Sequence, residues 1–123
     1  MRNERTGAVI ADQLIAAFDS RSRREGLLTR TMMPAGTAMV IAPTNAIHTC
    51  FMKFPIDVAF VRRDGRIVKI REGLSAWRMT GAWNGYAAIE MAAGSFARTG
   101  TRVGDSVCIT TPDTPVAISE SGM

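Results

Sequence analysis

Apolar residues occur along this chain in short runs that glycines, prolines and charged residues interrupt. With 11 glycines and 5 prolines, the pattern is typical of short strands joined by turns rather than of long helices. In the run around Ile89, alternate residues are apolar while Glu90 points to the other face. We predict strands at 13–18, 37–42, 48–51, 86–91 and 106–110.

The clearest element is a β-hairpin made of 56–61 and 66–71. Both arms are rich in β-branched residues, and Asp64-Gly65 lies between them. Asp-Gly between two such runs is a strong hairpin signal. We expect Gly65 to adopt a positive φ.

Two registers are possible for this hairpin. A two-residue turn would place Phe60 opposite Lys69, which mixes charge into an apolar face. A three-residue loop places Phe60 opposite Val68 and Asp57 opposite Arg71. The second register gives one apolar face and one favourable ion pair, so it is the register that we predict.

One short helix is predicted at 20–30, because Asp19 offers an N-cap and good helix formers follow it. Gly26 costs this helix about 1 kcal/mol, so packing must hold it. Residues 92–99 predict one turn of helix or a tight loop around Gly94.

The remaining long segment, 74–85, is rich in glycine and polar residues and is expected to be a loop. It contains both tryptophans, Trp77 and Trp83. The fold class is therefore α+β. We expect an N-terminal segment 1–12 that frays, a single domain at 13–110 and a C-terminal tail at 111–123.

Composition places the chain among soluble single-domain proteins, with 123 residues, 46% apolar and 21% charged. No apolar run approaches the ~20 residues that cross a bilayer, and no leader is visible, so the chain as given is expected to be cytoplasmic. A net charge of +4 permits weak phosphate contacts. Because acids interleave with the basic residues and no aromatic-basic ribbon accompanies them, we do not expect a nucleic-acid partner.

Five segments with a familiar combination of residues follow one another along the chain, at 26–30, 48–60, 64–68, 89–94 and 104–105. Together they resemble the domain-of-unknown-function-192 family of bacterial and archaeal proteins. The resemblance implies a small, partly open mixed β-barrel with one short helix, no assigned activity and no catalytic residues to transfer. Many relatives look exported, so a leader trimmed from this chain is also possible. Residues 74–78 depart from the proline-containing loop that the family leads us to expect.

His48 and Cys50 fall on one face of a predicted strand, where a His-activated thiolate is one interpretation. A metal site with Asp57 is another, but zinc needs three or four ligands and the chain has a single histidine. We therefore expect no metal and no cofactor, with His48 hydrogen-bonded at a strand start. Cys50 and Cys108 form no C-x-x-C pair and are expected to be reduced and mostly buried.

Two charged residues lie within apolar surroundings and need partners. Asp57 is expected to pair with Arg71 across the hairpin. Lys53 either pairs with Glu90 or faces a ligand.

The best functional hypothesis from the sequence is a non-enzymatic binding or accessory module. A polar cleft at one barrel end, lined by His48, Lys53, Trp77 and Arg78, would take a small anionic or polyhydroxyl ligand such as a sugar. Trp77 and Arg78 could instead only cover the barrel end. The alternative is a small enzyme that uses one of three residues as general acid or base, namely His48, Asp57 or Glu90.

Overall fold

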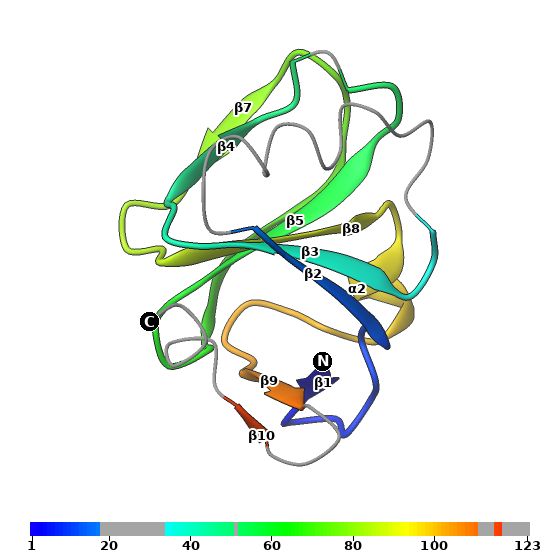
Figure 1. The fold of residues 1–123 in the computed structure, drawn as a ribbon, viewed down its shortest axis with the longest axis vertical. Coiled ribbons are helices and arrows are strands. Elements are labelled where there is room, and N and C mark those ends of the chain that lie inside the picture. The colour runs from blue at the N-terminus through cyan, green and yellow to red at the C-terminus, as the bar shows by residue number, and fades with distance from the viewer. Residues whose placement is uncertain (18–33, 51, 111–114, 117–123) are drawn as a thin grey trace.

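The structure, a computed structural model, describes residues 1–17, 34–50, 52–110 and 115–116 (Figure 1). Its largest sheet has five strands in the order β2-β3-β8-β5-β6. Strands β2 and β3 are parallel, and the other neighbours are antiparallel. The strands are β2 (Gln13–Ala17), β3 (Thr37–Ile41), β5 (Ile56–Val61), β6 (Ile67–Leu74) and β8 (Ala87–Ala92).

Two smaller sheets lie on opposite sides of the five-stranded sheet (Figure 1). One is a two-stranded antiparallel ribbon, the β4–β7 ribbon, made of β4 (Ala46–His48) and β7 (Met79–Gly81). The other has the order β1-β9-β10, with β1 (Arg2–Asn3), β9 (Val107–Thr110) and β10 (Pro115–Val116). The described residues are thus mostly β-sheet with one short helix, α2 (Ser95–Arg98), and their three sheets do not close into a barrel.

The predicted strands at 13–18, 37–42, 56–61, 86–91 and 106–110 are confirmed to within a few residues. Gly94, with φ 90°, precedes α2, which confirms the predicted helical turn. The strand expected at 48–51 lies earlier in the chain, because β4 spans Ala46–His48. The segment 74–85 is not a plain loop, because β7 lies within it. The helix predicted at 20–30 lies outside the described residues.

Both faces of the five-stranded sheet carry a hydrophobic core. Val58 and Phe60 of β5 belong to the cluster on the side of the β4–β7 ribbon. Ala59 and Val61 belong to the cluster on the other side, where Phe96 of α2 also packs. All six residues of β5 are buried, as expected for a strand that has neighbours on both edges and cores on both faces.

The predicted hairpin register is wrong beyond its first pair. Val61 lies opposite Ile67, as the three-residue loop requires, but Phe60 lies opposite Lys69. Val68 is therefore an extra residue on β6, which is the definition of a β-bulge. The prediction assumed that β5 has one polar face. Because β5 is buried on both faces, matching apolar faces cannot select the register.

The bulge at Val68 also moves Arg71 away from Asp57, its predicted partner, and a second register shift follows between Ile56 and Val58. Arg71 lies opposite Val58 and is exposed. The buried Asp57 carboxylate instead accepts hydrogen bonds from three backbone N–H groups, those of Gly73 at 2.9 Å, Gly94 at 3.0 Å and Phe96 at 3.4 Å. A carboxylate inside a core needs such donors, and these donors bring β6 and the turn before α2 together.

Residues of the N-terminal segment 1–12 make hydrogen bonds to distant parts of the described structure. Met1 is buried, and its ammonium group donates a hydrogen bond of 2.7 Å to the carbonyl of Ala11. Strand β1 pairs with β9. Cys50 and Cys108 are free thiols, as predicted, but both are half-buried rather than mostly buried.

Gly65 has the expected positive φ of 90°, and a Cβ there would lie 2.6 Å from the carbonyl oxygen of Val107. We expect Gly65→Ala to lower the free energy of unfolding by about 3 kcal/mol, from backbone strain plus this clash. Gly104→Ala is the matched control, because Gly104 has φ 96° and open space around it. Gly104→Ala should lower the free energy of unfolding by only about 1–2 kcal/mol. If urea titrations give the same loss in the free energy of unfolding for Gly65→Ala and Gly104→Ala, the contact with Val107 has no role.

Removing the Asp57 carboxylate leaves three backbone N–H groups without this acceptor. We expect Asp57→Ala to lower the free energy of unfolding by about 3 kcal/mol or more, and Asp57→Asn by less, because an amide oxygen can still accept. Glu72→Ala, at an exposed position on the adjacent strand, should change stability by less than about 0.5 kcal/mol. Denaturant unfolding of the three variants measures this, and an Asp57→Ala protein of wild-type stability would refute the role.

Candidate functional site

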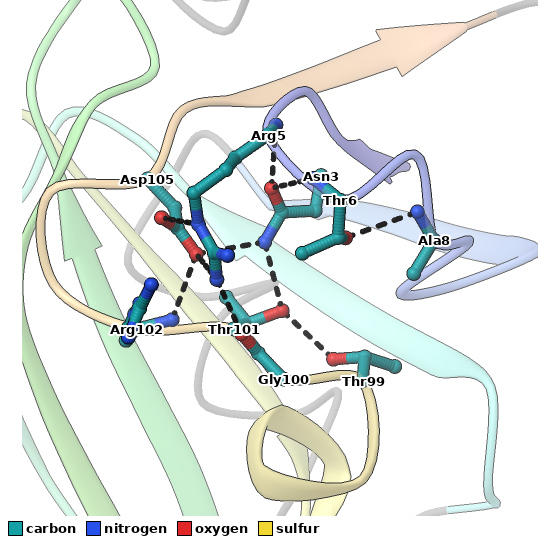
Figure 2. A network of polar contacts seen from close by, with 9 residues as sticks. All are labelled: Asn3, Arg5, Thr6, Ala8, Thr99, Gly100, Thr101, Arg102 and Asp105. Atoms are coloured by element: carbon teal, nitrogen blue, oxygen red, sulfur yellow. Dashed lines mark hydrogen bonds and ion pairs between the residues drawn. The ribbon is translucent and has the colours of Figure 1, made fainter.

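One dense polar cluster joins the N-terminal segment to the turn before β9, and it is structural (Figure 2). Asp105 accepts hydrogen bonds from Arg5 Nε at 2.6 Å, from Asn3 Nδ2 at 2.9 Å and from the Arg102 N–H at 3.0 Å. Asn3 Nδ2 also donates to Thr101. The hydrogen bond from Arg5, followed by those from Asn3 and Arg102, holds the pKa of Asp105 below its usual range. Every group here serves to connect chain segments.

The two acids considered as general acid or base lie on opposite faces of the five-stranded sheet. Glu90 pairs with Val58 across β8 and β5 and therefore shares its face. Asp57 precedes Val58 on β5 and points to the other face. Glu90 is buried and Lys53 is exposed; an ion pair between them stays a prediction. The sheet therefore separates Asp57 from Glu90.

The buried residue Thr49 joins the two segments in which site residues were predicted. Its N–H donates to the carbonyl of Arg78 at 2.8 Å, and its carbonyl accepts from the N–H of Trp77 at 3.2 Å. Its hydroxyl donates to the carbonyl of Ser75 at 2.6 Å and accepts from the N–H of Arg78 at 2.9 Å. These bonds continue the β4–β7 ladder and hold the backbone of His48 beside that of Trp77 and Arg78.

The β4–β7 ribbon has one inward and one outward face. Ile47 and Thr80 pair on the inward face; Ile47 packs against the hydrophobic cluster and Thr80 is buried. His48 and Met79 pair on the outward face and are both exposed. Lys69 Nζ of β6 donates a hydrogen bond of 2.7 Å to the carbonyl of Gly81, which fastens the ribbon to the five-stranded sheet.

Large apolar side chains are unusually exposed along this ribbon. Trp77 is 63% exposed, Met79 77% and Trp83 91%. Trp77 also has φ 65°, a left-handed conformation that is rare and costly for a bulky residue. Exposed aromatic residues of this size are typical of binding surfaces.

The chain segments that build the ribbon carry only positive charge. Residues 43–56 and 73–89 contain His48, Lys53 and Arg78 but no aspartate or glutamate. All three cationic or titratable residues are exposed. The ribbon segments therefore favour anionic groups.

The structure thus places the backbone of His48 beside that of Trp77 and Arg78, and a ligand site formed by their side chains stays a prediction. Lys53 lies farther along, after Met52, whose N–H donates to the carbonyl of Thr49 at 3.0 Å. Sequence reasoning missed Thr49 and the strand β7, because their pairing spans 29 residues of sequence. The alternation of apolar and polar residues over 77–80 was the available signal.

A metal centre finds no support in the part of the chain that the structure describes. No group of three histidine, cysteine, aspartate or glutamate residues lies close enough there to hold an ion. Among the same residues, no helix is long and apolar enough to cross a membrane.

The chain belongs to the DUF192 family, described as "Uncharacterized ACR", whose family model matches residues 2–109. This confirms the resemblance drawn from the sequence. The match begins at residue 2, so the family domain includes the N-terminal segment. No curated protein matches the sequence.

Two solved structures share the fold. A protein from Sinorhizobium meliloti, named a "putative transcription regulator", is 23% identical with a TM-score of 0.69, over 76% of this chain and 78% of that one. A protein of unknown function from Novosphingobium aromaticivorans is 24% identical with a TM-score of 0.68, over 76% and 71%. At these identities the likeness establishes the fold alone.

Stability should depend on pH through Asp105. Its pKa is lower in the folded protein than the value near 3.9 of the unfolded chain. Its contribution is therefore present above that value and is lost as the pH falls below it. Unfolding followed from pH 6 to pH 2 should show a smaller loss of stability in Asp105→Asn than in the wild type. Asp64→Asn is the control, because the exposed Arg62–Asp64 pair is screened by solvent. If stability falls with pH equally steeply in all three proteins, the prediction is wrong.

Proposed function

We propose that this protein is a non-enzymatic binding module whose β4–β7 ribbon takes an anionic or polyhydroxyl ligand. The observation that supports the proposal is the set of hydrogen bonds made by Thr49, which holds the backbone of His48 beside that of Trp77 and Arg78. Binding residues on loops held by a scaffold are the usual arrangement in small domains. The cleft expected at one end of a barrel stays a prediction.

The chemistry of these side chains suits a ligand with both apolar and negatively charged parts. A guanidinium such as that of Arg78 donates two parallel hydrogen bonds to a carboxylate, sulfate or phosphate. Trp77 offers a flat apolar face and an indole N–H. Lys53 adds a mobile positive charge near the same end of β4.

An enzymatic role has weaker support. Asp57 uses its carboxylate oxygens to accept backbone N–H groups, so it is poorly placed to exchange a proton with a substrate. Glu90 lies on the opposite face of the sheet, and His48 lies on the outward face of the ribbon. The three candidates are thus distributed over different surfaces.

Calorimetric titration with sulfate, galacturonate and glucose tests the proposal. We expect at least one of these ligands to bind with a dissociation constant of about 1 mM, equivalent to roughly 4 kcal/mol, and to raise the melting temperature. Arg78→Ala and Lys53→Ala should each weaken binding of an anionic ligand several-fold.

The matched control is Arg98→Ala, which removes the same charge from an exposed position on α2, across the sheet from the ribbon. Its affinity should equal that of the wild type. Absence of binding and of a thermal shift for all three ligands would overturn the proposal. Equal weakening by Arg98→Ala would also overturn it, because the effect would then reflect net charge alone.

A further inference from the structure

The two exposed tryptophans lie at opposite ends of the β4–β7 ribbon. At one end, the backbone N–H of Trp77 donates to the carbonyl of Thr49. At the other, the N–H of Ala82, directly before Trp83, donates to the carbonyl of Asn45 at 2.8 Å. Because a strand rises about 3.3 Å per residue, the four steps from 45 to 49 separate these ends by about 13 Å.

This separation sets the size of a ligand that uses both tryptophans. A single sugar ring or inorganic anion is much shorter than the ladder between Asn45 and Thr49. Trp77 and Trp83 are 63% and 91% exposed, and between them the outward face presents the His48–Met79 pair. A ligand that contacts both rings must therefore be extended along the ribbon.

The charge of the ribbon sets the chemistry of such a ligand. The two segments that build it contain no acidic residue, and their cations, Lys53 and Arg78, lie toward the Thr49 end of the ladder. Polar side chains flank the tryptophans, with Asn45 near one end of the ladder and Asn84 directly after Trp83. Flat apolar faces alternating with polar and cationic groups complement a chain of rings that has apolar faces, hydroxylated edges and intermittent negative charge.

We infer that the β4–β7 ribbon binds an extended acidic polysaccharide, with one sugar ring stacked on Trp77 and another on Trp83. Arg78 pairs with a carboxylate of the chain near Trp77. The inference rests on the proposed function and adds the ligand's class and length to it.

Two other polyanionic partners fit less well. A single-stranded nucleic acid carries a phosphate on every nucleotide and is bound through a row of cations along its backbone, whereas these segments supply only Lys53 and Arg78 as permanent charges. A lipid surface favours a continuous apolar patch beside basic residues, whereas polar Thr44 and Asn45 lie at the Trp83 end of the ribbon.

Titration with polygalacturonate, compared with galacturonate monomer and with the neutral glucan pullulan, tests the inference. We expect the polymer to bind at least tenfold more tightly than the monomer, and pullulan to bind weakly. Trp77→Ala and Trp83→Ala should each weaken polymer binding about five- to tenfold. Trp83→Ala should leave monomer binding beside Arg78 unchanged, a readout that loss of folding would not give.

Val103→Ala is the control for removal of an exposed apolar side chain, since Val103 is 57% exposed in the turn before β9, and it should bind like the wild type. If the monomer binds as tightly as the polymer, or if Trp83→Ala has no effect on the polymer, the inference fails while the proposed function stands. If neither binds, and sulfate and glucose also fail, both are wrong. Tighter binding of oligothymidylate or of anionic phosphatidylserine vesicles than of polygalacturonate, at one salt concentration, overturns the polysaccharide assignment.

Discussion

The buried carboxylate of Asp57 is the constraint around which the five-stranded sheet is arranged. It lies in strand β5, both faces of which are covered by hydrophobic core. A charge in such a position is tolerated only when donors surround it. Gly73 and Gly94, both with positive φ, turn their N–H groups toward it, so that a bulge in β6 and the start of α2 are fixed by one side chain.

The register of β6 also determines how the ribbon is attached to the five-stranded sheet. Without the bulge at Val68, Lys69 would lie opposite Ala59, and its side chain would point away from the ribbon. A shift of one residue moves a side chain to the other face of a strand. Opposite Phe60, Lys69 points to the ribbon side and donates to the carbonyl of Gly81. The ribbon position thus depends on an irregularity in its neighbour.

Local patterns in the sequence predict most strands, the left-handed Gly65 and the turn at Gly94, because turns and alternation are decided by neighbouring residues. The register beyond Val68 could not be predicted, because burial of β5 on its second face depends on segments distant in sequence. For the site, the composition of residues 74–85 placed Trp77 and Arg78 in one segment, either as ligand contacts or as a cover of the barrel end. That the backbone of this segment lies beside His48 could not be predicted, since it requires Thr49 to pair with a strand that no local signal marked clearly.

The hydrogen-bonded carboxylates and the outward face of the ribbon lie in different parts of the fold. Asp57 and Asp105, which each accept several hydrogen bonds, both serve the sheets and turns away from the ribbon's outward face. The ribbon is held instead by backbone groups, by the hydroxyl of Thr49 and by Lys69. Its outward side chains can therefore change with little cost to the core, whereas the identity of Thr49 is tied to the geometry. A surface that is rigid in backbone and free in side chain is what a binding module needs, because affinity then depends on preformed contacts rather than on ordering a loop.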